Sequence, residues 1–330
     1  MNRAKFSEYL RDLLEDKDID INHNLVLTKG FSEHTNQEHT NNVFSEKWEI
    51  YGESDEQEKA FKFQCDWYLK LYGFDTEQNL SNFLKSKKVI FDAGCGLGYK
   101  AAWLAKLAPD SLVIGMDFSD STYQAAKTYG DVENLFFIKG DIAQTGFCNN
   151  SVDFSSCDQV IMHTEDPEAT FGELARITEN ENGELACYFY AKKALPRELL
   201  DDYFRIQCKE MENYELWEMS KQLTELGKNL SALSANFDCP DIPALGIKGG
   251  SYDIQRFIYW NFLKCFWNQD LGQETSVATN FDWYSPSNAR RFSELEVKSI
   301  VDKNRMSEIF FHVEEACFSG RFKHHSDPVL

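Results

Sequence analysis

The sequence predicts an α/β fold in which a mostly parallel sheet is completed by an antiparallel hairpin and carries additional helical segments. Three observations predict it. A buried strand at 89–93 passes through a glycine turn into a helix at 99–107, and further apolar strands ending in polar residues follow along the chain. About ninety residues, 194–286, then separate this part from a last helix and two strands.

Composition limits the class of protein. The chain has 330 residues, of which 42% are hydrophobic, enough for a sizeable core, and it has no run of eighteen apolar residues. Its first residues are polar and charged and lack an apolar signal core, so we expect a cytoplasmic protein without a membrane segment. A net charge of −20 disfavours nucleic acid as a partner.

The cysteines and histidines do not indicate a metal site. Nine cysteines are scattered singly and no C-x-x-C pair occurs, which argues against both a zinc ribbon and a disulfide framework. No group of histidines and carboxylates has convincing ligand spacing either. We therefore expect reduced, mostly buried thiols and no bound metal.

Residues 1–88 are expected to form a helical N-terminal extension. Apolar residues follow helical spacing between Phe6 and Leu14 and again, rich in aromatics, between Phe44 and Leu84, while 33–42 is polar and loop-like. The simplest interpretation is that these helices pack against the sheet. The alternative is that part of the extension covers an active site.

The turn after the first strand reads Asp92-Ala93-Gly94-Cys95-Gly96-Leu97-Gly98. Glycines allow positive φ and let backbone N–H groups approach a ligand closely. A dinucleotide site would instead need G-x-G-x-x-G, with the third glycine three residues after the second. The carboxylate of Asp92 would repel a pyrophosphate and suits a ligand that carries an ammonium group.

Two further strands end in acids. The strand at 111–116 ends at Asp117, just over twenty residues after Gly94, where a βαβ unit places a carboxylate for a ribose diol. The alternative is a helix N-cap, with Asp117 or Ser119 opening the helix that begins at Ser121. The strand at 134–139 ends in Gly-Asp-Ile, and its Asp141 has a solvated turn as the alternative.

The fourth strand lies within 151–162, a segment that contains Asp158 and Gln159 and leads to His163. Asp166 followed by Pro167 predicts the start of the next helix. A fifth strand at 184–190 follows a turn at Asn182-Gly183. An N/D-P-P-Y/F tetrapeptide, typical of enzymes that methylate nucleic-acid bases, is missing after the fourth strand.

Over residues 89–193, this order of motifs resembles the class I S-adenosylmethionine-dependent methyltransferases, of the type-11 kind. The resemblance implies a Rossmann-like sheet of seven strands, S-adenosyl-L-methionine as cofactor and S-adenosyl-L-homocysteine as product. It places Asp92 near the amino group of the cofactor, Asp117 on the ribose beside Phe118, and Asp141 with Ile142 at the adenine. The cofactor-binding residues so implied are Asp92, Gly94, Cys95, Gly96, Asp117, Phe118, Asp141, Ile142, Asp158 and Gln159.

The insertion at 194–286 is expected to be helical and rich in aromatic residues. Pro196 can open a long helical segment, and a second segment runs from Ile254 to Trp267. Both are too apolar to stand free in water, so we expect a lid that binds substrate, with a homodimer interface as the alternative. The end of the insertion is expected to be a loop that supplies Asp282, Trp283 and Tyr284 as substrate contacts, and its aromatics would suit a cationic amine.

Residues 287–330 complete the predicted core. A Ser293/Glu296 capping box predicts the start of the last helix. Apolar runs at 308–313 and 317–323 predict the terminal antiparallel hairpin.

The resemblance implies methyl transfer to an O, N, S or C nucleophile of a small molecule by in-line displacement. His163 is the histidine expected next to the cofactor, with a role as general base or, alternatively, in packing alone. Three other functions stay open: a protein or peptide methyltransferase, a non-catalytic subunit that binds the cofactor, and a dinucleotide oxidoreductase.

Overall fold

The computed structural model describes residues 2–27 and 55–325, so the expectations for the polar stretch at 33–42 and for 44–54 lie outside the described residues. The chain divides into two compact units. The first comprises Gln64–Tyr190 with the described parts of Met1–Thr35 and Arg290–Leu330. The second comprises Ala191–Ala289 with the described part of Asn36–Phe63, and the predicted insertion falls within it.

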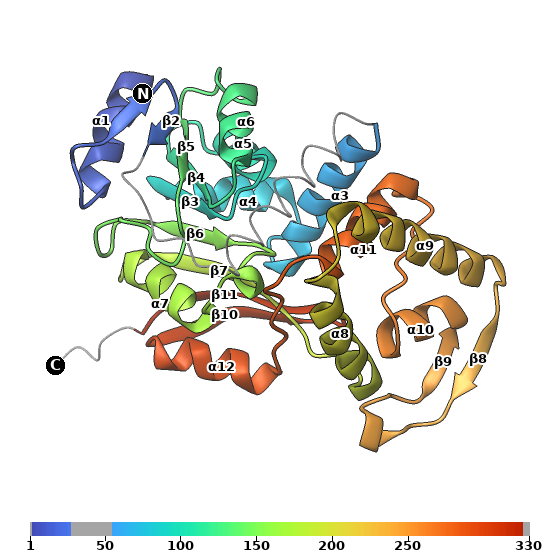
Figure 1. Ribbon diagram of the computed structural model, residues 1–330. Coiled ribbons are helices and arrows are strands. Elements are labelled where there is room, and N and C mark those ends of the chain that lie inside the picture. Colours follow the sequence, from blue (N-terminus) through green and yellow to red (C-terminus); the bar gives the residue numbers. More distant parts are fainter. Residues whose placement is uncertain (1, 28–54, 326–330) are drawn as a thin grey trace. The chain divides into compact units, whose positions relative to one another are not determined.

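The first unit contains a sheet whose strands follow the order β1-β2-β5-β4-β3-β6-β7-β11-β10 (Figure 1). Strands β5, β4, β3, β6 and β7 are parallel to one another, and β11 runs antiparallel to both β7 and β10. The predicted parallel sheet with a terminal antiparallel hairpin is therefore confirmed. The seven strands of this core are β3 (Val89–Ala93), β4 (Leu112–Asp117), β5 (Leu135–Lys139), β6 (Phe154–Cys157), β7 (Glu184–Tyr190), β10 (Met306–Val313) and β11 (Cys317–His324).

The N-terminal segment is not wholly helical, and the prediction for it was wrong in this respect. After α1 (Arg3–Leu13), two three-residue strands, β1 (Asp20–Asn22) and β2 (Leu25–Leu27), pair with each other, and β2 joins the sheet parallel to β5. The Phe137 N–H donates to the Asn24 carbonyl at 2.8 Å. Strands this short show no periodicity in the sequence, so tertiary pairing alone defines them.

Helices cover both sides of this sheet (Figure 1). Helices α4 (Glu77–Leu84), α5 (Tyr99–Leu107) and α6 (Ser121–Thr128) lie on one side, and α7 (Pro167–Ile177) and α12 (Glu294–Lys303) on the other. Strand β3 is therefore buried at every position, as parallel strands usually are. Two predicted helix starts are confirmed: Asp166 caps α7, and Ser293 forms a capping box with Glu296 at α12.

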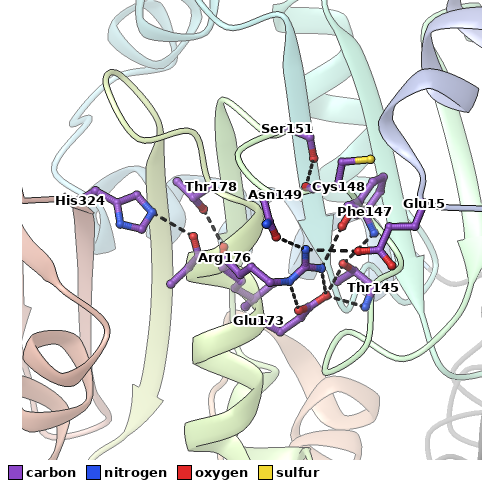
Figure 2. A network of polar contacts seen from close by, with 12 residues as sticks. Glu15, Thr145, Phe147, Cys148, Asn149, Ser151, Glu173, Arg176, Thr178 and His324 are labelled. Carbon is purple, nitrogen blue, oxygen red and sulfur yellow. Dashed lines mark hydrogen bonds and ion pairs between the residues drawn. The ribbon is translucent and has the colours of Figure 1, made fainter.

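A polar network ties α7 to the connection between β5 and β6 (Figure 2). The Arg176 guanidinium donates to Glu173 at 2.7 Å, to the Asn149 side chain at 2.6 Å and to the Phe147 carbonyl at 2.9 Å. Glu173 also accepts from the N–H and hydroxyl of Thr145. These bonds hold the segment 145–149, which continues from the turn at Asp141, in one conformation.

The second unit is mainly helical, as predicted, but its elements differ from those read in the sequence. The helical segment that starts near Pro196 is two helices, because a capping box formed by Glu212 and Glu215 begins a second one. A hairpin was not predicted at all. The elements are α8 (Leu195–Cys208), α9 (Asn213–Ala232), β8 (Asn236–Cys239), β9 (Gly250–Asp253), α10 (Ile254–Asn261) and α11 (Gly272–Tyr284).

The expectation of an irregular stretch at 280–284 was wrong, because these residues form the end of α11. Asn280 is fully buried and donates to Thr224 at 2.8 Å and to the Phe266 carbonyl at 3.0 Å. The Phe281 ring stacks on Trp217 with 4.0 Å between centroids. Burial on several sides stabilises this helix, which therefore lacks the amphipathic pattern by which sequence analysis finds helices. Among the described residues, none of the helices combines the length and hydrophobicity needed to cross a bilayer.

Candidate active site

The predicted site acids come together at the carboxyl edge of the parallel strands. Asp92 in β3 lies beside Gly115 of β4 and Ser156 of β6, and Asp117 ends β4 beside Lys139 of β5. Asp141 and Asp158 follow the last residues of β5 and β6. Ligands of open α/β sheets bind at this edge.

The glycine turn has the geometry that its sequence predicts. Gly94, Gly96 and Gly98 have φ values of 79°, 52° and 77°. A Cβ atom at Gly94 would lie 2.4 Å from Val160, and one at Gly98 would lie 2.6 Å from Phe137. Both backbone strain and space therefore demand glycine at these two positions.

Asp117 is fixed by donors on either side. Its Oδ2 accepts from the Gly96 N–H at 2.8 Å, and its Oδ1 accepts from the N–H and hydroxyl of Ser119 at 2.9 and 2.6 Å. A carboxylate has about four acceptor positions, so this half-buried group can still accept from a ligand hydroxyl. The alternative role as helix cap was wrong, since Asp120 is the N-cap residue of α6.

Asp92 is the most unusual of the acids. It is 2% exposed, and its Oδ2 has no hydrogen-bond donor within the described residues. Burial raises its pKa to about 7, an effect that Asp158 and Asp117 reinforce and Lys100 opposes. A cationic ligand group would satisfy this oxygen and favour the charged carboxylate.

Lys100 and Tyr72 belong to the site, and sequence analysis missed both. Lys100, in the first turn of α5, forms a buried ion pair with Asp158, which also accepts from the Tyr72 hydroxyl at 2.9 Å. Although burial alone would lower the pKa of Lys100, its neighbour Asp158 raises it. Asp158 thus has three donors within the protein, the third being Gln159 at 3.2 Å.

The remaining predicted cofactor residues lie around the same edge. Asp141 closes its own turn, accepting from the Ala143 N–H at 2.8 Å, and Ile142 is buried. Phe118 is half-buried next to Asp117. Gln159 has a φ of 64°, the left-handed conformation, and donates to Gln64 at 2.7 Å. Their roles at a cofactor remain predictions.

The model of the methyltransferase domain family matches residues 91–187, which include the glycine turn and all four acids. This segment is therefore similar to a methyltransferase domain, in agreement with the resemblance found in the sequence. The match covers strands β4, β5 and β6 whole and most of β3 and β7. The match therefore falls on the five parallel strands β3, β4, β5, β6 and β7.

Similar proteins support this assignment for the domain. A sterol 24-C-methyltransferase of Aspergillus fumigatus is 31% identical over 98 residues, which are 28% of this chain and 26% of that protein. A malonyl-[acyl-carrier protein] O-methyltransferase of Legionella pneumophila is 28% identical over 137 residues, or 39% of this chain and 48% of that protein. The match thus spans about a quarter to a half of the length of these relatives.

A solved structure shows the same fold. PKMT2 from Rickettsia typhi superimposes with a TM-score of 0.50 and 14% identity, covering 76% of this chain and 52% of that one. The likeness concerns the fold alone.

His163, the predicted base of the methyltransferase domain, ends a short 3-10 helix at Ile161–His163 after β6. It is 7% exposed, and its ring meets Tyr190 edge-on at 5.5 Å. Asp282, Trp283 and Tyr284 belong to the second unit, where Asp201 accepts from the Trp283 indole at 2.8 Å and from the Tyr284 hydroxyl at 3.1 Å. The polar atoms of both aromatics thus have partners inside that unit.

Proposed function

We propose that this protein is an S-adenosylmethionine-dependent methyltransferase that methylates an O, N, S or C nucleophile of a small molecule. The observation that carries the proposal is the buried Oδ2 of Asp92, which lacks a donor among the described residues and lies two residues before the glycine turn. The amino-acid part of the cofactor carries an ammonium group, which would donate to this oxygen. A dinucleotide offers only phosphates to a turn at this position.

The other acids fit the rest of the cofactor. Asp117 has acceptor capacity left for a ribose hydroxyl, and Asp141, Ile142 and Phe118 would hold the adenine. When bound, S-adenosylmethionine supplies an electrophilic methyl group on a sulfonium. The chain itself must then align the acceptor in line with that methyl group and exclude water.

The names of the relatives support a small organic acceptor. One methylates a sterol carbon by its name, and another an oxygen of a malonyl group that is carried by an acyl-carrier protein. We assign acceptor recognition to the insertion at 194–286, which lies outside the family match. We also propose that the protein is cytoplasmic. A homodimer formed through the insertion is a further proposal, which sedimentation measurements would test.

His163 is our proposed base for an acceptor that must lose a proton. If it serves as the base, His163→Asn should lower kcat more than it changes KM and should remove the acidic limb of the pH–rate profile. A purely structural histidine would instead change the thermal stability and leave the shape of that profile intact.

The cofactor assignment is tested by calorimetric titration with S-adenosylmethionine and S-adenosylhomocysteine. We expect micromolar binding by the wild type and at least about tenfold weaker binding by Asp92→Asn and Asp117→Ala. Asp120→Ala is the matched control, because Asp120 is an exposed acid three residues from Asp117. Folded protein that binds NADH and neither of these ligands would overturn the proposal.

A further inference from the structure

The last two turns of helix α3 (Asp55–Leu71) belong to the first unit and carry a row of polar side chains. These are Gln64, Tyr68 and Tyr72, which follow one another at intervals of four residues and so share one face. The Tyr72 N–H donates to the Tyr68 carbonyl at 3.2 Å, which extends the last turn. The hydroxyls of Tyr68 and Ser156 lie 3.0 Å apart, so this face contacts β6.

The first residue of this row, Gln64, binds a residue with a strained backbone. Its side-chain carbonyl accepts from the Gln159 amide at 2.7 Å, and the same amide donates to Asp158 at 3.2 Å. Gln159 has a φ of 64°, in the left-handed region where the Cβ of any residue other than glycine is crowded. Residues in such conformations persist only where their neighbours hold them, and they gather at functional sites.

The conformation of Gln159 determines where the next residue, Val160, lies. Val160 packs against the glycine turn, because a Cβ atom at Gly94 would overlap both of its methyl groups. Val160 thus forms one wall of the turn that begins two residues after Asp92. A rotation of the backbone at Gln159 would move this wall away from the turn.

We propose that Gln64 is a positioning residue for S-adenosylmethionine: its bond to Gln159 keeps that residue left-handed and thereby keeps Val160 against the glycine turn. The inference rests on the proposed function and extends it to α3, which lies outside the family match. A wall that is already in place costs less to order when the ligand binds. Because the turn and Asp92 are assigned to the amino-acid end of the cofactor, Gln64 should affect the binding of that end alone.

The test is calorimetric titration of the full chain with S-adenosylhomocysteine and with methylthioadenosine, which lacks the amino-acid end. Gln64→Leu should bind S-adenosylhomocysteine about five- to tenfold more weakly than the wild type, and methylthioadenosine equally well. Gln64→Glu should retain most of the affinity, since its carboxylate still accepts from Gln159. A residue that only stabilises the fold would weaken the binding of both ligands or of neither.

The matched control is Gln78→Leu, the same change at an exposed glutamine of α4. Gln78 donates to the Asn82 side chain within its own helix, so the variant should bind both ligands like the wild type.

A second variant separates positioning from direct contact with the cofactor. Glycine adopts a φ of 64° without strain, so in Gln159→Gly the backbone no longer depends on Gln64. Adding Gln64→Leu to Gln159→Gly should therefore change the affinity for S-adenosylhomocysteine by less than about twofold. If Gln64 contacted the cofactor itself, its loss would weaken binding by the same factor in both backgrounds.

Three outcomes would overturn this inference and leave the proposed function intact. They are wild-type affinity of Gln64→Leu for S-adenosylhomocysteine, equal weakening of both ligands by that variant, and an undiminished effect of Gln64→Leu when Gln159 is glycine. Wild-type protein that binds no S-adenosylhomocysteine would instead overturn the proposed function, and this inference with it.

Discussion

The carboxyl group of Asp92 has a pKa of about 7 because burial disfavours its charged form. An acid whose pKa is higher in the folded state than in the unfolded state binds more protons when folded. The free energy of unfolding should therefore fall as pH rises from about 4 to about 7. A bound cation favours the charged carboxylate of this residue, whereas the stability of the protein without ligand favours the neutral carboxyl group.

Asp92→Asn should accordingly stabilise the protein without ligand at alkaline pH. Relative to the wild type, the gain in the free energy of unfolding should be small near pH 4 and rise to at most about 4 kcal/mol near pH 8. Chemical denaturation at several pH values measures it. A variant no more stable than the wild type at about pH 8 would show that the ionised carboxylate is well solvated.

Lys100→Met should destabilise the protein strongly, because it leaves the buried carboxylate of Asp158 without its cation. We expect a loss of about 3–5 kcal/mol in the free energy of unfolding, which the double variant with Asp158→Asn should partly restore. Lys221→Met removes an exposed partner of Glu218 and should have little effect. Equal losses for the two single variants would contradict the role of burial.

The sequence predicted the acids of the candidate site better than it predicted the residues that pair with them. Asp92, Asp117, Asp141 and Asp158 were predictable because parallel strands bring their carboxyl ends to one edge. Lys100 was not, since its pairing with Asp158 joins residues 58 positions apart. The available signal was its place on the helix face shared with Leu104, which is unusual for a lysine.

At the scale of elements, a position can require glycine for two reasons: its backbone conformation, or the lack of space for a side chain. Gly98 and Gly146 have φ values of 77° and 70°, yet a Cβ would lie 2.6 Å from Phe137 at Gly98 and would meet nothing within 4 Å at Gly146. Alanine substitution at the two positions therefore distinguishes strain from overlap.

Gly146→Ala should cost about 1–2 kcal/mol through its left-handed conformation alone. Gly98→Ala should cost about 2–5 kcal/mol, because the overlap with Phe137 adds to the same strain. Thermal unfolding of both variants gives the comparison. If the two midpoints shift equally, Phe137 moves aside freely and the space at Gly98 does not matter.

Local signals predicted the elements that local interactions define. The caps at Asp166 and Ser293 lie within three residues of the N–H groups that they bind, so the sequence shows them directly. Strands β1 and β2, the hairpin β8–β9 and the last turn of α11 depend on distant partners instead. No window of the sequence contains those partners.

At the scale of the whole molecule, the chain divides into two compact units, and we expect each to unfold in its own transition. S-adenosylhomocysteine should raise only the transition of the unit that contains Asp117. Asp201→Ala should lower only the other transition, because it leaves Arg197 buried without its carboxylate, a loss of about 3–5 kcal/mol. Differential scanning calorimetry measures both, and a single transition that moves with either change would contradict this expectation.

The order of strands in the sheet also constrains the chain during synthesis. Strand β11 is made after β10 but lies between β10 and β7. While the ribosome is still making residues 317–324, β7 has an open edge and β10 has no partner. Such an edge can pair with another nascent chain. Nascent chains held close together on a polysome are therefore expected to aggregate more readily until β11 has formed and covers the edge of β7.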